Sequence, residues 1–227
     1  MKNSIKFLWL FFLLAFIFIN CGKKDEETKP AENTNQTATS SNVPNDAKVY
    51  DVKSGIVTFN DVIMKGMTQV FYFDDYGKKE ARYTTMEMEI AGQKIRSGSV
   101  EINVDGYLIN YDIEKKEGTK TKSYGSIGGT KDLPKELDKL SKELMDKYHL
   151  KEIAPKEVLG KQCKGYEIET MGINSKVWIW NNIMLSSVVQ MSKDSKPIEM
   201  TASKIETDVQ IPPEKFQVPA DVKIKEL

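Results

Sequence analysis

Alternation of apolar and polar residues runs through most of the chain after Lys48. In the segment 84–90, one set of alternate positions holds Thr84, Met86, Met88 and Ile90, and the other set holds Thr85, Glu87 and Glu89. A period of two places these sets on opposite faces of a half-buried strand. The same pattern predicts ten strands in all, near 49–59, 67–73, 84–90, 100–104, 107–113, 119–125, 163–170, 174–180, 183–191 and 197–209.

Turn residues separate these strands at hairpin distances. Asp105-Gly106 predicts a tight primed turn, in which glycine supplies a positive φ. Asp74-Asp75-Tyr76-Gly77, Ala91-Gly92 and Met171-Gly172 mark further turns. Short connections between consecutive strands indicate an antiparallel sheet, and a sheet of about ten strands must curl or close to protect its edges.

One segment has helical spacing instead. Leu133, Leu137, Leu140, Leu144 and Tyr148 recur three or four residues apart, and Asp132 is a suitable N-cap. We therefore expect an amphipathic helix over about 132–149 that covers the sheet. Its outer face carries the i,i+4 pairs Asp138/Lys142 and Glu143/Lys147, which are typical of a solvated surface.

The N-terminus follows a different pattern. Residues 1–20 combine Lys2 and Lys6 with 13 consecutive apolar residues, Phe7 to Ile19, too few for a helix across a hydrocarbon core of about 30 Å. This organisation predicts a signal peptide. Phe18-Ile19-Asn20-Cys21-Gly22 follows and resembles the lipobox of bacterial lipoproteins, which implies diacylation of Cys21 and cleavage before it. An ordinary secretory signal cleaved elsewhere is the alternative.

Residues 21–47 contain the predicted lipidated cysteine and a polar tether. The tether, 22–47, has one Val and no other large apolar side chain, so it cannot bury enough surface to fold. At about 5–6 Å times the square root of its length it reaches roughly 25–30 Å. Lys24-Asp25-Glu26-Glu27 resembles the export signal of some surface lipoproteins, whereas Gly22 is compatible with the outer membrane facing the periplasm.

Residues 48–227 have uniform composition and are expected to form one mainly β (α+β) domain. This order of strands and helix, behind a lipidated cysteine, resembles the half-barrel of the bacterial lipoprotein carriers LolA and LolB. The local sequences that carry the resemblance are 160–169, Val177-Trp178-Ile179-Trp180 with Ile183-Met184-Leu185, and 211–219. The resemblance implies a curled sheet that binds a lipid or an acylated peptide in its concave face.

Composition and charge limit the possible partners. The chain has 33 Lys and Arg against 33 Asp and Glu, and removal of residues 1–20, with two lysines and no acid, leaves a net charge of −2. Such a balance provides no bulk attraction to nucleic acid phosphates. We expect the partners to be the membrane, through the acyl chains, and a hydrophobic ligand or another lipoprotein, with no nucleic acid.

Catalytic and metal-binding motifs are absent from the sequence. The one histidine, His149, stands at the end of the predicted helix, and there is no GxSxG elbow, HExxH motif or phosphate-binding glycine loop. Cys163 reads as a buried strand thiol in preference to a reactive one. We therefore expect a protein that is not an enzyme and has no metal or cofactor.

The strongest functional signal is the set of aromatic and methionine side chains on the strands. Flexible methionines and aromatic rings form an adaptable apolar wall that suits acyl chains. Two interpretations stay open: these residues line a ligand-binding groove, or they form the core beneath the helix. A second functional hypothesis is a structural lipoprotein that binds another protein through a sheet edge or the charged helix face. The candidate ligand-binding residues are Phe71, Phe73, Met86, Met88, Tyr107, Tyr111, Trp178 and Trp180.

Overall fold

The computed structural model describes residues 48–227 except 91, 124, 129–144, 146–149 and 171. The chain divides into two units, Met1–Val43 and Pro44–Leu227, and all described residues belong to the second. The predicted signal peptide, Cys21, the predicted tether and His149 lie outside the described residues. So does the helix predicted over 132–149, except Met145, which packs against Leu150, Tyr166 and Ile179.

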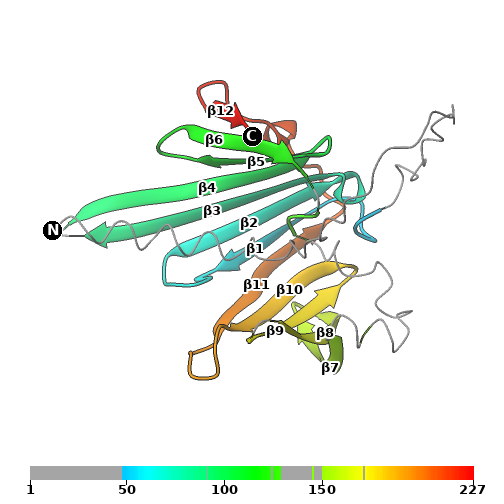
Figure 1. Ribbon diagram of the computed structural model, residues 1–227. Helices are drawn as coiled ribbons and strands as arrows, with labels where there is room; N and C mark the ends of the chain where they lie inside the picture. Colours follow the sequence, from blue (N-terminus) through cyan, green and yellow to red (C-terminus); the bar gives the residue numbers. More distant parts are fainter. Residues whose placement is uncertain (1–47, 91, 124, 129–144, 146–149, 171) are drawn as a thin grey trace, which may run out of the picture. The chain divides into compact units, whose positions relative to one another are not determined.

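In the part of the chain that the structure describes, twelve strands form one open, curled sheet (Figure 1). Their order in the sheet is β12-β6-β5-β4-β3-β2-β1-β11-β10-β9-β8-β7. All neighbours pair antiparallel except β12 and β6, which pair parallel. The strands are β1 (Gly55–Asn60), β2 (Met67–Asp74), β3 (Lys79–Ile90), β4 (Gln93–Val104), β5 (Tyr107–Asp112), β6 (Glu117–Lys122), β7 (Leu150–Val158), β8 (Lys161–Thr170), β9 (Ile173–Trp180), β10 (Ile183–Gln190), β11 (Ile198–Thr207) and β12 (Lys223–Glu226).

The curled, mainly β sheet expected from the sequence is confirmed, with two strands more than the ten predicted. The additional strands, β7 and β12, are the two edges of the sheet. β7 contains Pro155 and four charged side chains, and β12 has only four residues, three of them charged. Prolines, charges and short length protect an edge from unwanted pairing, and they also remove the alternation that identifies a strand in sequence.

Turn chemistry agrees with the prediction where the turns are described. Asp105 and Gly106 both have positive φ, 52° and 78°, as a type I′ hairpin requires. The first strand differs, because it begins at Gly55 and not near residue 49. Residues 48–54 run instead between two turns at one end of the sheet. The backbone N–H of Val49 donates to Tyr76 O (2.8 Å), and that of Asp51 donates to Asn181 O (3.3 Å).

One face of the sheet carries a large buried group, here called the inner cluster. It brings together residues from β2 and β3 with residues from β7 and β8, which are far apart in the strand order. Such strands can share one cluster only when the sheet curls around it, so this face is the concave, inner face. The cluster comprises Tyr50, Val52, Val57, Phe59, Val62, Met67, Phe71, Phe73, Met86, Val158, Cys163, Ile183, Leu185 and Ala202.

The opposite face of β3–β5 is buried by the C-terminal segment. Residues 209–222 pass across it, and the Tyr83 hydroxyl donates to Lys215 O (3.0 Å). Ile211 and Phe216 are buried there against Ala81, Val100, Ile102 and Tyr111, and we call this group the outer cluster. Both faces of this part of the sheet therefore contribute to the core.

The inner cluster predicts a large difference between two aromatic truncations. Phe73 is fully buried and touches Tyr50, with ring centroids 4.8 Å apart, whereas Tyr107 is 40% exposed. We expect Phe73→Ala to lower the free energy of unfolding by about 3–5 kcal/mol. Tyr107→Ala should cost less than about 1 kcal/mol. Urea denaturation of residues 44–227, a unit that contains all twelve strands and their clusters, measures both, and equal losses would contradict this assignment of the core.

Candidate functional site

The structure brings six of the eight candidate ligand-binding residues together on the inner face. Phe71, Phe73 and Met86 belong to the inner cluster. Met88, Trp178 and Trp180 are half-buried and pack against it. Because β3 and β9 are separated by four strands in the sheet order, only the curl of the sheet makes this group possible.

Phe71 and Phe73 are core residues. Their rings stack with centroids 5.8 Å apart, and the ring of Tyr50 covers both. Gly128 lies so close to Phe71 that an added Cβ would stand 2.2 Å from its ring. Both side chains are at most 3% exposed, so the core interpretation holds for this pair.

Met86, Met88 and the tryptophans lie toward the margin of the cluster. Met86 is 8% exposed, and Met88 faces Ile95 across the β3–β4 ladder. Ile95 is 43% exposed, so apolar surface continues from the cluster to the solvent along this hairpin. The indole N–H of Trp178 donates to Ala154 O (3.1 Å), which fixes the ring on the inner face.

Tyr107 and Tyr111 lie on the other face of the sheet. Tyr111 is buried in the outer cluster, and Tyr107 shares its parity on β5. The Lys120 ammonium stands 4.2 Å from the centroid of the Tyr107 ring. These two tyrosines therefore do not join the other six candidates.

A buried carboxyl group that sequence reasoning missed organises one end of the inner face. Glu80 is fully buried and accepts four hydrogen bonds. The hydroxyls of Tyr50 and Ser126 donate to Oε1. Asn103 Nδ2 (2.8 Å) and the backbone N–H of Ile127 (2.9 Å) donate to Oε2. Glu80 shares its parity on β3 with Met86 and Met88, which was the available signal that it points inward.

These bonds attach two irregular segments to the sheet. Tyr50 comes from residues 48–54, while Ser126 and Ile127 come from the connection that follows β6. Burial, and next the nearby Glu80 carboxyl, raise the pKa of Tyr50 well above its usual range. The tyrosine hydroxyl therefore keeps its proton and remains a donor throughout the physiological pH range.

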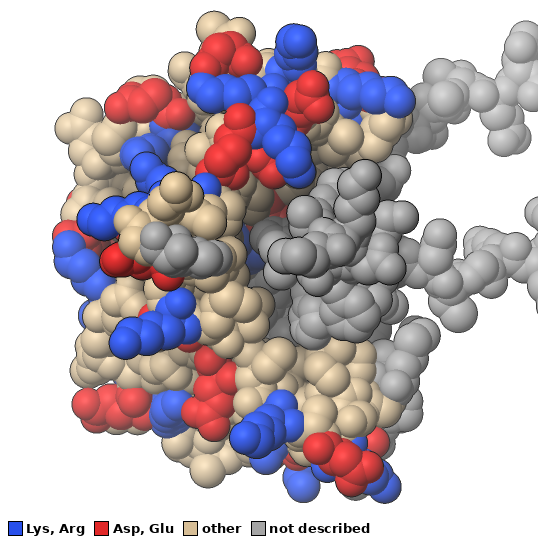
Figure 2. Space-filling model, turned by 90° about the vertical axis from the view of Figure 1, so that its left-hand side faces the viewer, with Lys and Arg blue, Asp and Glu red and all other residues tan. Residues whose placement is uncertain are grey.

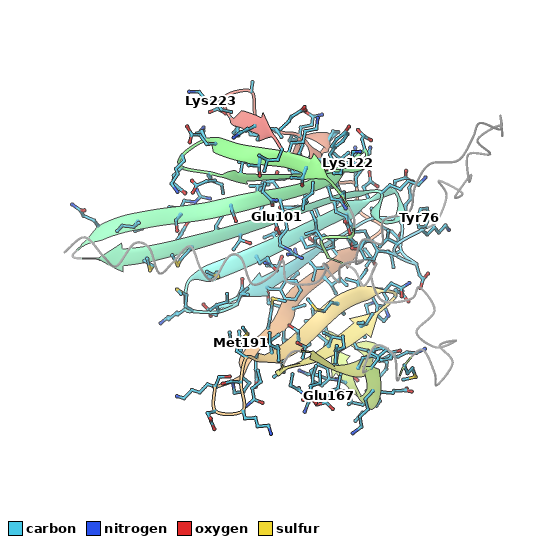
Figure 3. The ribbon with its side chains drawn as sticks, in the orientation of Figure 1. Tyr76, Glu101, Lys122, Glu167, Met191 and Lys223 are labelled. Carbon is cyan, nitrogen blue, oxygen red and sulfur yellow. The ribbon has the colours of Figure 1, made fainter. Side chains whose placement is uncertain are left out.

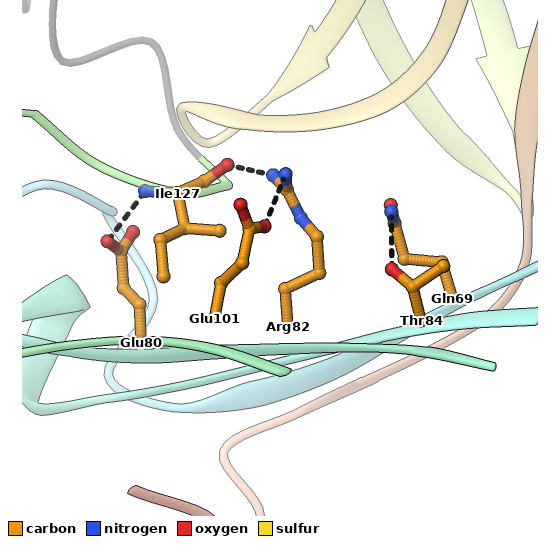
Figure 4. A network of polar contacts seen from close by, with 6 residues as sticks. All are labelled: Gln69, Glu80, Arg82, Thr84, Glu101 and Ile127. Atoms are coloured by element: carbon orange, nitrogen blue, oxygen red, sulfur yellow. Dashed lines mark hydrogen bonds and ion pairs between the residues drawn. The ribbon is translucent and has the colours of Figure 1, made fainter. Parts of the chain in front are cut away.

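Arg82 extends this polar group along the inner face (Figure 4). Its Nη1 donates to Glu101 Oε2 (3.1 Å), and its Nη2 donates to the carbonyl oxygen of Ile127. Gln69 and Thr84 continue the row, with Nε2 3.3 Å from Oγ1. The inner face is therefore amphipathic, with polar side chains on β3 and β4 beside the apolar cluster.

Residues 48–54 lie at one end of the strands and not at the other. Tyr76 marks the end at which these residues and the hydrogen bonds of Glu80 lie, and Met191 marks the opposite end (Figure 3). At that opposite end the β1–β2 connection presents Ile63 and Met64, which are 53% and 40% exposed. Figure 2 shows this side of the molecule, where basic and acidic residues are intermixed without a large region of one sign.

Cys163 has the properties of a structural thiol. It is 1% exposed within the inner cluster, and burial raises its pKa. A reactive cysteine needs an accessible thiolate. The structure therefore supports the buried-strand interpretation of this residue.

Other kinds of site have little support in the described part of the chain. There, no three His, Cys, Asp or Glu side chains are placed to hold a metal ion. A shallow hollow lies along β6 and β12, between Thr119 and Ile224, away from the six grouped candidates. No helix within the described ranges has the length and apolar character to span a membrane.

The Glu80 bonds predict a strong effect of a single side chain. Glu80→Ala would leave buried donors without an acceptor, at about 1–3 kcal/mol for each that water cannot reach. We expect a loss of at least about 3 kcal/mol in the free energy of unfolding. Glu87→Ala is the matched control, because Glu87 is exposed on the same strand and should change stability by less than about 1 kcal/mol. Similar melting temperatures for the two variants would contradict the role of Glu80.

Comparison with known proteins yields structural neighbours only. No family model and no curated protein matches the chain. An uncharacterized conserved protein from Thermus thermophilus has a TM-score of 0.49 at 8% identity, over 78% of this chain and 92% of its own. MucB has a TM-score of 0.44 at 8% identity over 78% of this chain, which spans 60% of MucB. A putative outer membrane lipoprotein-sorting protein domain from Vibrio parahaemolyticus has a TM-score of 0.26 at 10% identity, over 73% of this chain and 88% of its own. At these scores the likenesses assign no family to the chain.

Proposed function

We propose that this chain is a non-enzymatic, lipid-anchored protein of the bacterial envelope that binds a hydrophobic ligand on the inner face of its sheet. The observation that carries the proposal is that Met88, Trp178 and Trp180 each pack against the same large buried cluster and each retain exposure. The ligand class is a lipid or an acylated peptide. Met86 contributes to the same surface from within the cluster.

The mobility and chemistry of these side chains suit such a ligand. Methionine has three rotatable bonds and a polarizable sulfur, so its side chain adapts to an irregular apolar partner. Each methylene that a ligand buries on such a surface contributes about 0.8 kcal/mol. An acyl chain can therefore bind to Met88 and the tryptophan rings by extending the existing core, without a closed cavity.

The polar half of the inner face restricts how an acyl chain lies. Glu80 and Arg82 have specific partners there, and Thr84 binds Gln69. An acyl chain on these groups would break hydrogen bonds without replacing them, at a cost of about 1–3 kcal/mol each. The acyl chain of the ligand is therefore directed to the apolar half of the inner face, between β3 and β9.

The N-terminal pattern supports the anchor. Acyl chains on Cys21 would hold the chain at a membrane, since two chains bind far more firmly than one. We propose the outer membrane, with the domain facing the periplasm, and display on the cell surface as the alternative. Protease treatment of intact cells separates these two locations, because only a displayed domain is cleaved.

The alternative function is binding of another envelope protein by a sheet edge or by the charged face of the helix predicted over 132–149, which lies outside the described residues except Met145. Both edge strands oppose binding by an edge. β7 has Pro155 and a register shift between Ile153 and Lys156, and β12 is a short, charged strand. These are features with which proteins prevent strand addition. Ligand binding on the inner face is therefore the function that the geometry supports best.

Ligand binding predicts contact between an acyl chain and the tryptophans. Residues 44–227 contain Trp178 and Trp180 and no other tryptophan, so their fluorescence reports on this surface alone. We expect a neutral monoacylglycerol with a brominated chain to quench it in a saturable manner. Met88→Gln should weaken this binding about five- to tenfold, as expected for the loss of apolar contact.

Tyr107→Gln is the control for that measurement, because Tyr107 lies on the opposite face and should leave the quenching unchanged. Mass spectrometry of the purified protein should also detect lipid that co-purifies. Absence of both lipid and quenching would leave the inner cluster as a packed core and would remove the proposal.

Anchoring predicts a specific role for the first cysteine of the chain. Cys21→Ser should abolish incorporation of labelled palmitate and move the protein from the membrane fraction to the soluble fraction. Cys163→Ser should retain both the label and the membrane location, since Cys163 is a buried strand residue. Labelling of the Cys21→Ser protein would contradict lipidation at this position.

A further inference from the structure

Two lysines on the inner face lie over the two tryptophans. Lys156 on β7 places its ammonium 5.0 Å from the centroid of the Trp178 ring. Lys161, at the start of β8, places its ammonium 4.6 Å from that of Trp180. Trp178 and Trp180 are two residues apart on β9, so the two lysine–tryptophan pairs repeat at about 7 Å along the strand.

These two lysines differ from a nearby lysine, Lys176, in having no carboxyl group of the described residues close to their ammonium groups. Among the described residues, no carboxyl group lies within ion-pair distance of Lys156 or Lys161. The next lysine on the same face of β9 is different, because Lys176 Nζ lies 3.8 Å from Glu167 Oε1. Within the described sheet, the positive charge of Lys176 is therefore balanced by a carboxylate, and the charges of Lys156 and Lys161 are not.

The hydrogen bonds of Lys156 leave room for a further acceptor. Its Nζ lies 3.1 Å from Ser186 Oγ, and that hydroxyl lies 2.8 Å from Thr201 Oγ1. An ammonium has three N–H groups, so two of them have no acceptor in the part of the chain that the structure describes. Both lysines are half-buried beside Val158 and Cys163, where reduced hydration makes an anionic ligand more favourable than at a fully exposed site.

We propose that Lys156, Lys161, Trp178 and Trp180 form a binding site for an anionic group, a phosphate or a carboxylate, at the head of an amphiphile. The ammonium groups bind the anion. The tryptophan rings hold the ammonium groups in place by cation–π attraction and offer apolar surface to the first methylenes of the chain. This inference rests on the proposed function, because the chain of the amphiphile lies on the same inner face.

The test compares amphiphiles that share a chain and differ in the head. With residues 44–227 and the brominated monoacylglycerol bound, we expect dodecyl phosphate, below its micelle concentration, to displace it and restore tryptophan fluorescence at a concentration about tenfold or more below that needed for monolaurin. Lys156→Gln combined with Lys161→Gln should remove this preference and leave monolaurin binding within about twofold. Equal affinity for the two amphiphiles in the original protein would overturn the site, while binding to monolaurin would still support the proposed function.

Matched variants control for charge and folding. Lys176→Gln removes one positive charge from the same face and should preserve the preference for dodecyl phosphate. Lys156→Arg combined with Lys161→Arg should retain it as well, which separates loss of charge from loss of structure. A preference that survives the double glutamine variant, or that disappears in Lys176→Gln, would overturn the assignment.

Inorganic phosphate distinguishes a lipid head from a free anion. We expect it to compete with dodecyl phosphate only at concentrations at least about a hundredfold higher, because it lacks the apolar chain. Competition by inorganic phosphate at the same concentration as dodecyl phosphate would overturn the amphiphile as the ligand. Failure of both dodecyl phosphate and monolaurin to bind would overturn the proposed function together with this site.

Discussion

Curling of the sheet around the inner cluster is the constraint on which the other features depend. Val158 and Cys163 on β7 and β8 meet Phe71 and Met86 on β2 and β3 only because the sheet bends through the strands between them. Register shifts in β1–β11, β9–β10 and β7–β8 accompany this bend. An extra residue in one strand increases local twist, so bulges at these places help the sheet to curl. The same curl leaves the tryptophans of β9 at the margin of the cluster.

Closure of one end depends on polar chemistry. A buried Glu80 would be costly alone, but four donors satisfy it, and those donors belong mainly to segments without regular structure. The carboxyl group thereby fixes the position of the chain before β1 and after β6. Arg82 adds a bond to the same backbone region at Ile127. The inner face therefore has a rigid polar end and an apolar part in which flexible side chains remain partly exposed.

Sequence alternation was sufficient for the strands that have one buried face. It failed at β7 and β12, because edge strands have charged residues, a proline or very short length in place of an apolar face. When both faces of a strand are buried, alternation of apolar and polar residues also cannot show which face is the inner face of the curled sheet. The alternation on β5 predicts that Tyr111 is buried, and it is. It is buried against the C-terminal segment, however, and not beside the candidates on β2, β3 and β9. That contact joins residues about 100 positions apart, which no local pattern contains.

The chemistry of the inner face was the least predictable part, because charged residues in strands usually face solvent. Glu80, Lys156 and Lys161 are ordinary members of a chain with 33 basic and 33 acidic residues. What distinguishes them is their partners within the described sheet: Glu80 has four donors, and each of the two lysines has a tryptophan ring and no carboxyl group. A net charge near zero therefore conceals a local imbalance on the face that also carries exposed apolar surface. An anionic amphiphile matches both properties at once, since its head balances the two lysines and its chain extends the inner cluster.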